Sequence, residues 1–198
     1  MRAWPLKKPA PGRPAPTAFL DRDGTINPNK AGSYITSPDQ LRLYSFTPAA
    51  IRLLSAKGYR VVVITNQSAV GRGYMTMAAS RAVNLKLVRE LRRAGARVDA
   101  VYFCPHRPDE GCRCRKPMPG LIEEAGAEFP AALAQSFVAG DKKCDLDLAR
   151  RAGLKGRLVL TGQWRSSLGA AAAARGSKNL LALARAVPDF RKINKGKD

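Results

Sequence analysis

The sequence of 198 residues contains few aromatic residues, few acidic residues and no long apolar run. No segment approaches the roughly 18 consecutive apolar residues that a membrane-spanning helix needs, which argues against a membrane protein. Aromatic residues make up only 7% of the chain and are scattered, so there is no obvious platform on which nucleic-acid bases could stack. Residues 1–16 lack the apolar core of a secretory signal, and we therefore expect a cytoplasmic protein.

The shortage of acidic residues leaves a strongly basic chain. Lysine and arginine number 35 against 15 acidic residues, which gives a net charge of +20. Most of this excess lies within residues 17–187 rather than at the two ends of the chain. A basic body raises the local concentration of an anionic substrate. It also suits nucleic acid, a partner that we keep open without favouring it, and it equally suits a surface whose charges serve only solvation.

The chain length favours one domain. We expect one folded domain over residues 17–187, preceded by a flexible proline-rich basic arm over 1–16 and followed by a basic tail over 188–198. Apolar runs rich in β-branched residues alternate with helical patterns, which predicts an α/β fold: a Rossmann-like, doubly wound parallel sheet. The expected strands are 17–20, 60–65, 98–103, 136–139 and 157–160. The expected helices are 47–57, 76–94, 120–127, 146–152 and 178–187, with Thr76 and Ser177 as N-caps.

Two aspartates, Asp21 and Asp23, follow the first expected strand and precede Gly24. Residues i and i+2 of an extended chain point the same way, so the two carboxylates are aimed at one spot. Carboxylates that close repel each other unless a cation or a proton lies between them. Thr65 and Asp141 also fall at expected strand ends, where open α/β sheets bind ligands. The pattern predicts a metal site and a carboxylate that can attack a phosphoryl group.

Three of the four cysteines and the only histidine lie close together in the sequence, at Cys104, His106, Cys112 and Cys114. This Cys₃His set is typical of a closed structural zinc site, and we expect Zn²⁺ there. Disulfides are the alternative, but they suit secreted chains, and Cys112 and Cys114 are too close for an easy bridge. Cys144 is left over and is expected to be a small packing residue.

Four segments occur in order along the chain: Asp21–Thr25, Thr65–Gln67, Lys116–Pro117 and Gly140–Asp141. Their order resembles the haloacid dehalogenase superfamily of phosphohydrolases, and the segments span most of the chain. The resemblance implies a magnesium-dependent phosphomonoester hydrolase. Because neither segment between the motifs has room for a large cap domain, it further implies an uncapped haloacid dehalogenase fold with a zinc loop.

The same resemblance implies a role for each motif residue. Asp21 is the implied nucleophile that forms an aspartyl-phosphate, and Asp23 is the general acid and then the base that activates water. Thr65 and Lys116 are implied to stabilise the phosphoryl oxygens. Asp21, Asp141 and the backbone carbonyl of Asp23 are implied to hold Mg²⁺.

Asp145 lies one helical turn beyond Asp141. It could orient Lys116 or a metal-bound water, or it could be a simple helix cap.

The longer segments around these motifs are Asp21–Asn27, Ile64–Gly73, Cys104–Gly120 and Gly140–Lys142. Together they resemble the family of D-glycero-D-manno-heptose 1,7-bisphosphate 7-phosphatases, which implies a small phosphorylated sugar as substrate and removal of its 7-phosphate. Histidinol-phosphate phosphatases have closely similar motifs, and a DNA 3′-phosphatase or a nucleic-acid-binding protein is a further alternative. The flap after Asn27 is slightly longer, and the zinc loop shorter, than this resemblance leads us to expect. We expect a monomer. The residues implied to contact substrate are Asn66, Gln67, Ser68, Arg72, Arg115 and Lys142, together with Asn29, Lys30 and Tyr34.

Overall fold

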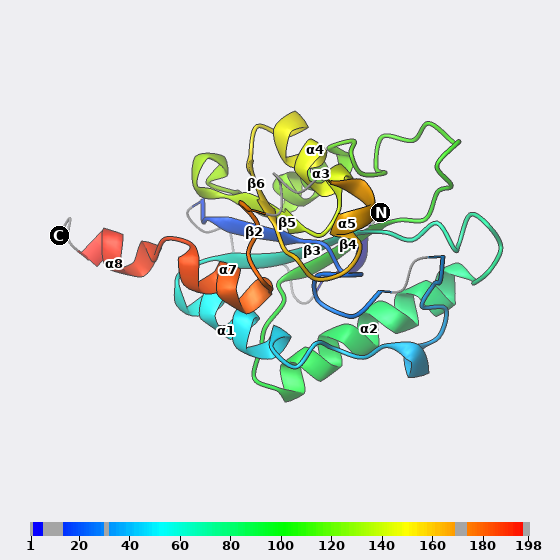
Figure 1. Cartoon of the computed structure of the whole chain (residues 1–198), viewed down its shortest axis with the longest axis horizontal. Coiled ribbons are helices and arrows are strands. Elements are labelled where there is room, and N and C mark those ends of the chain that lie inside the picture. Colours follow the sequence, from blue (N-terminus) through cyan, green and yellow to red (C-terminus); the bar gives the residue numbers. More distant parts are fainter. Residues whose placement is uncertain (1, 6–13, 30–31, 169–173, 196–198) are drawn as a thin grey trace.

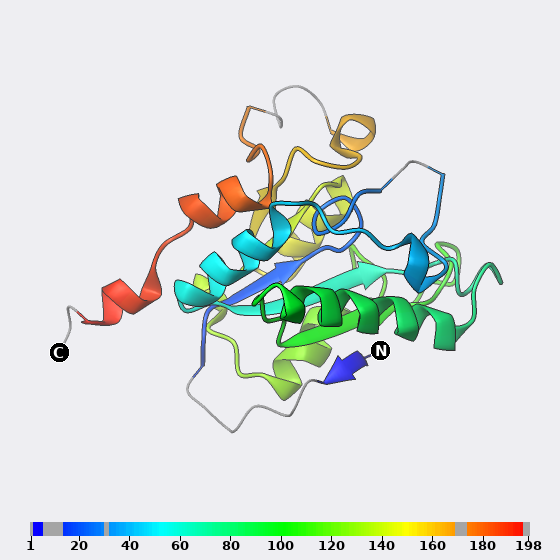
Figure 2. The same cartoon turned by 90° about the horizontal axis from the view of Figure 1, so that it is seen from below.

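The computed structural model describes residues 2–5, 14–29, 32–168 and 174–195. A six-stranded sheet in the order β1-β4-β3-β2-β5-β6 forms the middle layer, and helices cover both of its faces (Figures 1 and 2). The strands are β1 (Arg2–Pro5), β2 (Thr17–Leu20), β3 (Arg60–Asn66), β4 (Ala100–Cys104), β5 (Phe137–Gly140) and β6 (Lys155–Leu158). The α-helices are α1 (Thr47–Ala56), α2 (Met77–Arg93), α3 (Gly120–Glu128), α4 (Lys143–Arg151), α5 (Trp164–Ser167), α7 (Leu180–Ala186) and α8 (Phe190–Lys195). Two short 3₁₀ helices, η1 (Pro38–Gln40) and η2 (Leu133–Gln135), lie in the connections.

Strands β2 to β6 are parallel to one another, which confirms the predicted doubly wound sheet. Their side chains alternate between two apolar cores. Val61 and Val63 of β3 pack in the core beneath α1, α2 and α7, whereas Val62 and Ile64 pack in the core beneath α3 and α4. Because both faces of the sheet are covered, the central strands are apolar at nearly every position.

Most helix limits follow the local signals in the sequence, but α4 begins at Lys143 rather than at residue 146, and β6 spans Lys155–Leu158 rather than 157–160. Thr76 caps α2 as predicted, and its side chain accepts a hydrogen bond from the Ala79 amide. Helix α7, however, begins at Leu180 and is capped by Asn179 rather than by Ser177. Ser177 instead pairs with Val159 in an isolated β-bridge, so its backbone extends the sheet and is not available to start a helix.

The two ends of the chain differ from the sequence expectation. The sequence predicts an unpacked arm over residues 1–16, but Arg2–Pro5 forms β1 and pairs antiparallel with β4. This pairing covers hydrogen-bonding groups that the edge of β4 would otherwise expose. Within the expected basic tail, Phe190 begins α8 and its ring lies 5.3 Å from that of Tyr59. Residues 6–13 and 196–198 lie outside the described part of the chain.

Strand β2 lies between β3 and β5. The chain passes from β2 to β3 and β4 on one side of β2, and then crosses to β5 and β6 on its other side. Such a switch in strand order opens a crevice at the carboxyl ends of the strands. The described residues between Gly24 and Phe46 form loops and η1, and those between Gln67 and Cys114 form loops, α2 and β4. These described stretches contain no separate cap domain, so loops surround the crevice. None of the helices in the described part of the chain combines the length and apolarity needed to cross a bilayer.

Candidate active site

Three buried carboxylates meet at the carboxyl ends of β2 and β5. Asp21 follows β2, and its amide donates to the carbonyl oxygen of Ala139 in β5 (2.8 Å). Asp141 follows β5, and Asp145 lies in the first turn of α4. One carboxylate oxygen from each of Asp21, Asp141 and Asp145 lies within 4.8 Å of the others. The strand order therefore brings together acids that are more than 100 residues apart in sequence.

Lys116 places a positive charge among these carboxylates. Its Nζ lies 2.7 Å from Oδ1 of Asp21 and 2.6 Å from Oδ1 of Asp145. Burial alone would lower the pKa of Lys116, but the carboxylates of Asp145 and Asp21 outweigh it and raise the pKa above its ordinary value. The lysine is therefore protonated at neutral pH.

The side chains of Asn66 and Asp145 fix the position of Lys116. Asn66 donates to the Lys116 carbonyl (3.2 Å) and accepts from the Lys116 amide (3.0 Å), which fixes the backbone of the lysine beside the end of β3. Oδ2 of Asp145 accepts from the Lys142 amide (3.1 Å), while its Oδ1 faces Lys116. The two roles considered for Asp145 are thus combined, since one oxygen caps α4 and the other orients the lysine.

The carboxylate of Asp141 has the properties of a cation ligand. Its Oδ1 is buried and has no hydrogen-bond partner among the described residues, and its Oδ2 accepts from the backbone amide of Gln163 (2.5 Å). Burial, followed by the nearby charge of Asp21, raises the pKa of Asp141 to about 7. A buried acceptor without a partner is costly unless an ion or a proton satisfies it. Asp21 and Asp141 together therefore fit a divalent ion that prefers oxygen ligands.

A cation at this position would be closely surrounded by backbone. Gly24 has a φ of 99° and Gly162 a φ of 51°, and a Cβ atom at either position would collide with the Asp141 carboxylate. The hydroxyl of Thr161 also donates to the Gly24 carbonyl (2.6 Å). Thr161–Gln163 was not predicted as part of the site, because this segment matches none of the sequence motifs and reaches Asp141 only through the fold.

Asp23 sits in a shell of four hydrogen-bond donors. Its Oδ1 accepts from Arg22 Nε (3.1 Å) and Asn27 Nδ2 (3.0 Å), and its Oδ2 accepts from a terminal nitrogen of Arg22 (2.9 Å) and from Gln67 Nε2 (2.8 Å). Burial raises the pKa of this carboxyl, but the charge of Arg22 and the three donor side chains outweigh it and hold the pKa below its ordinary value. Gln67 also donates to the Thr65 hydroxyl (2.9 Å), which links the two motif residues.

Arg22 itself was missed in the sequence analysis. A signal for it exists, because the residue between two aspartates that point into a site must point the opposite way, into the core. The structure places it there, fully buried.

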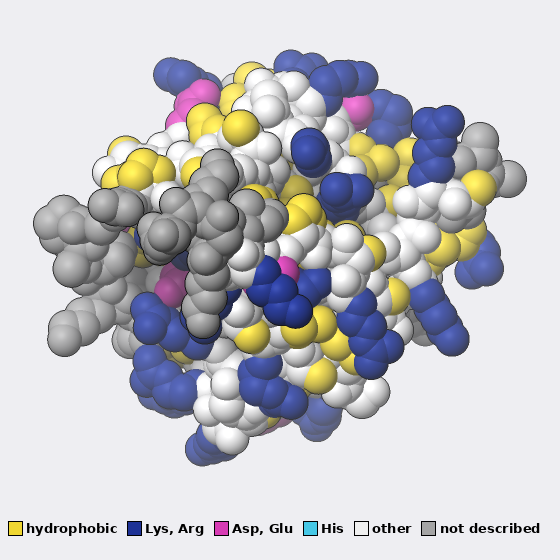
Figure 3. Space-filling view, turned by 90° about the vertical axis from the view of Figure 1, so that its left-hand side faces the viewer, with side chains coloured by type: hydrophobic (Ala, Val, Ile, Leu, Met, Phe, Trp, Pro, Cys, Tyr) yellow, Lys and Arg dark blue, Asp and Glu magenta, His cyan; other side chains and the backbone are white. Residues whose placement is uncertain are grey.

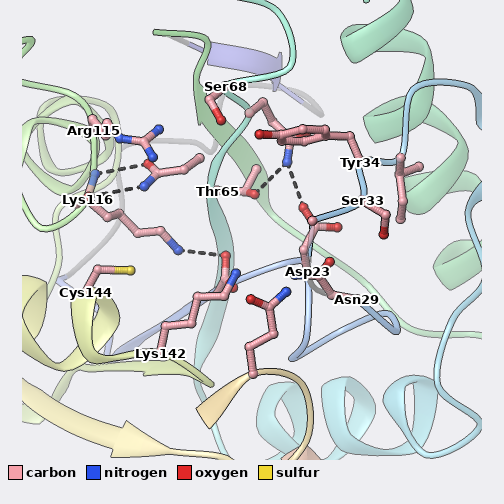
Figure 4. Close-up of a pocket in the computed structure, with 16 residues that line it drawn as sticks. Asp23, Asn29, Ser33, Tyr34, Thr65, Ser68, Arg115, Lys116, Lys142 and Cys144 are labelled. Atoms are coloured by element: carbon pink, nitrogen blue, oxygen red, sulfur yellow. Dashed lines mark hydrogen bonds and ion pairs between the residues drawn. The ribbon is translucent and has the colours of Figure 1, made fainter. Parts of the chain in front are cut away.

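Asp21, Asp23, Thr65 and Lys116 are among the residues that line a cavity of about 250 Å³ (Figure 4). Of the residues implied to contact substrate, the cavity is lined by Asn29, Tyr34, Asn66, Gln67, Ser68, Arg115 and Lys142. Arg72 is exposed and does not line it, so the structure does not bring this residue to the site. Lys30 lies outside the described residues. Cys144, expected as a packing residue, lines the cavity instead, and its sulfur is directed toward Lys116 in Figure 4.

The Cys₃His set forms a second cluster, between the end of β4 and Lys116. Nδ1 of His106 lies 3.5 Å from the sulfur of Cys104 and 3.2 Å from that of Cys114. The sulfur of Cys112 lies 3.6 Å from each of the other two sulfurs. In a tetrahedral zinc shell with Zn–S bonds near 2.3 Å, neighbouring sulfurs are about 3.8 Å apart. All four ligand atoms lie within 4.8 Å of one another, which is compatible with a closed zinc site.

The fold and the carboxylate cluster define a hydrolase of the haloacid dehalogenase type. A family model for HAD-hydrolase-like proteins matches residues 113–184. The chain is 46% identical over 144 residues to the probable D-glycero-D-manno-heptose-1,7-bisphosphate 7-phosphatase of Thermoplasma acidophilum, covering 72% of this chain and 89% of that protein. It is 43% identical to the corresponding phosphatase of Rhodopseudomonas palustris, covering 74% and 83%.

A solved structure agrees with these relatives. The crystal structure of the D,D-heptose 1,7-bisphosphate phosphatase from B. bronchiseptica, complexed with magnesium and phosphate, superimposes with a TM-score of 0.78. It is 34% identical to this chain, and the match covers 86% of this chain and 96% of that one. This chain therefore belongs to the heptose-bisphosphate phosphatase family of haloacid dehalogenase-like hydrolases.

Proposed function

We propose that this protein removes the 7-phosphate of D-glycero-D-manno-heptose 1,7-bisphosphate, through a covalent aspartyl-phosphate on Asp21. The observation that carries the proposal is the ion pair of Lys116 with Asp21, buried at the end of β2 and beside Asp141. This arrangement suits attack of an oxygen nucleophile on phosphorus in a site of low dielectric. The identity of the substrate is inferred from the relatives, which are named as phosphatases of this sugar.

Two metals fit the residues present. Mg²⁺ would be held by Asp21, Asp141 and the backbone carbonyl of Asp23, where it would neutralise phosphate charge and polarise the phosphoryl group. Its support is the buried and unpaired Oδ1 of Asp141. Zn²⁺ would be held by the Cys₃His cluster, and with four protein ligands it would serve the fold rather than the chemistry.

In the first half-reaction, a carboxylate oxygen of Asp21 forms a bond to phosphorus as the ester bond to the sugar oxygen breaks. The negative charge of the bound phosphate raises the pKa of Asp23 from its low value in the free protein, so that Asp23 can carry a proton and donate it to that departing oxygen. Lys116 and the Thr65 hydroxyl stabilise the negative charge that develops on the phosphoryl oxygens. In the second half-reaction, Asp23 takes a proton from water, the water oxygen bonds to phosphorus, and the bond between phosphorus and Asp21 breaks.

The cavity also offers groups for the second phosphate and the sugar. Arg115 and Lys142 add positive charge to its wall, and Asn29 and Tyr34 line it from the flap (Figure 4). A substrate with two phosphates would have one cleaved and the other gripped by these cations. Because loops rather than a cap surround the site, these side chains would have to provide the specificity.

Phosphate release from three substrates tests the proposal: heptose 1,7-bisphosphate, histidinol phosphate and an oligonucleotide with a 3′-phosphate. We expect kcat/KM to be at least about tenfold higher for the heptose bisphosphate, since its second phosphate contributes charge-assisted hydrogen bonds. Turnover of either other substrate without turnover of the heptose bisphosphate would disprove the proposed substrate. A gel-retardation series in rising salt would measure nucleic-acid affinity separately.

A further inference from the structure

All three side-chain nitrogens of the fully buried Arg22 donate hydrogen bonds, and their two partners are Asp23 and Asn84. Nε and one terminal nitrogen form a two-point contact with the carboxylate of Asp23, at 3.1 and 2.9 Å. The other terminal nitrogen donates to Oδ1 of Asn84 (2.9 Å). A buried guanidinium is costly unless its donors are satisfied, so these contacts tie its position to both partners.

Asn84 connects this arginine to the long helix α2. Its side chain is buried, and its Nδ2 donates to the Ser80 carbonyl one turn earlier in the helix (3.1 Å). Because an amide nitrogen only donates, this bond leaves the Asn84 carbonyl oxygen directed at Arg22. Helix α2 thereby fixes the plane of the Arg22 guanidinium through Asn84, and the guanidinium in turn fixes the plane of the Asp23 carboxylate.

We propose that Arg22 and Asn84 are positioning residues that direct the Asp23 carboxylate at the leaving oxygen of the substrate. The inference rests on the proposed function, in which Asp23 protonates that oxygen. Misplacement of a reacting group by about 1 Å can cost roughly a hundredfold in rate. Asn27 and Gln67 hold the carboxylate from its other side. Asn84 acts from α2 without touching the cavity, and no sequence motif identifies it.

The test compares two phosphate esters that differ in their need for a proton. The alkoxide of β-glycerol phosphate must be protonated as it leaves, whereas p-nitrophenolate leaves readily without a proton. Asn84→Ala is expected to lower kcat/KM for β-glycerol phosphate about tenfold or more and to leave kcat/KM for p-nitrophenyl phosphate within about twofold. The comparison uses kcat/KM because this quantity reports on the steps up to departure of the leaving group, and not on the later hydrolysis in which Asp23 serves both esters. Arg22→Lys keeps the positive charge but not the planar fork, and it should shift the ratio of the two rates in the same direction.

Ser80→Ala is the matched control, because Ser80 lies one turn away on the same buried face of α2. Its hydroxyl has no hydrogen-bond partner among the described residues, so the ratio of rates should stay at the wild-type value. The ratio is independent of the folded fraction, since both esters report on the same folded molecules. Equal losses on both esters, or no loss on either, in Asn84→Ala would overturn the inference. A wild-type enzyme that cleaves both esters but not heptose bisphosphate would count against the proposed substrate alone.

Discussion

At the scale of single residues, Lys116 makes the buried acids compatible with the fold. Asp21 and Asp145 each lie within 2.7 Å of its ammonium, and Asp141 is close by. Without that cation the neighbouring carboxylates would repel each other and take up protons. Loss of the single cation from such a buried cluster typically costs about 3–5 kcal/mol, because the carboxylates are left uncompensated. The same side chain therefore serves both stability and the proposed chemistry.

Asp21→Asn is the most direct test of the covalent route. The amide has nearly the size of the carboxylate but is a poor nucleophile, so phosphate release should fall to background. The fold should remain intact, which the near-UV and far-UV circular dichroism spectra would check. Substantial residual turnover in the folded variant would rule out an aspartyl-phosphate at this residue.

The raised pKa of Asp141 predicts that magnesium binding depends on pH. Below a pH of about 7 this carboxyl is protonated in the metal-free protein, so Mg²⁺ must displace a proton. Affinity for Mg²⁺ should therefore fall as the pH is lowered from 8 to 6, by up to about tenfold per pH unit below 7. Isothermal titration calorimetry at several pH values would measure it. In Asp141→Asn, binding should be weak at every pH; tight binding there would exclude Asp141 as a ligand.

The sequence was sufficient to predict the residues that carry a motif at a strand end. Asp21, Asp23 and Asp141 are found this way because the carboxyl ends of parallel strands meet at one edge of a sheet. It was not sufficient for Asn84 or Gln163, since their contacts with the site arise only when α2 and the segment after β6 are packed. Such residues have ordinary local surroundings in sequence and are recognised only by their partners.

At the scale of elements, the loop that carries the Cys₃His set connects β4 to the active site. It begins at Cys104, the last residue of β4, and Cys114 is followed by Arg115 and Lys116. The carbonyl of His106 accepts a hydrogen bond from Arg115 (3.3 Å). A zinc ion bound by these four ligands would stabilise the loop, because the binding free energy of the metal adds to the folding free energy. The loop thereby positions two cations that line the cavity.

Cys112→Ser should remove bound zinc and loosen this loop. We expect about one zinc per chain in the wild-type protein, much less in the variant, and a lower Tm in the variant, as measured by atomic emission and thermal unfolding. The kcat/KM at saturating Mg²⁺ should also fall, since Arg115 and Lys116 lose their anchor. Cys144→Ser is the control, because Cys144 lies outside the cluster and should retain zinc. Equal zinc content in Cys112→Ser and wild type would refute the site.

Strands and helices were predictable where one signal dominated, as at Thr76 or in the β-branched run of β3. The exceptions, β1 and the start of α7, have a common cause. A short segment without strong periodicity is ordered by the partner that it finds, here the open edge of β4 for Arg2–Pro5 and the backbone beyond β6 for Ser177. Such partners are set by tertiary structure rather than by local propensity.

At the scale of the whole molecule, charge dominates the surface. Figure 3 shows lysine and arginine side chains spread over one face of the protein, with few acidic side chains among them. A field of one sign accelerates the encounter with ligands of the opposite sign, and salt screens it over about 8 Å at physiological ionic strength. The basic body is therefore expected to favour capture of substrates with several negative charges.

Salt should accordingly affect a bisphosphate more than a monophosphate. Raising NaCl from about 20 mM to 500 mM should lower kcat/KM for heptose 1,7-bisphosphate several-fold, mainly through KM, and lower it less for p-nitrophenyl phosphate. Steady-state kinetics at constant Mg²⁺ would measure both. Equal salt sensitivity of the two substrates would show that the surface charge does not assist capture of the bisphosphate.

The closure of the site by Thr161–Gln163 has a consequence for biosynthesis. These residues come after every motif of the chain, yet the Gln163 amide holds Asp141 and Thr161 secures Gly24. A nascent polypeptide that has emerged only as far as β6 carries Asp21, Asp23 and Lys116 but still lacks the segment that contacts Asp141 and Gly24. The active site is therefore complete only after residues 161–163 have packed against Gly24 and Asp141, which follow β2 and β5.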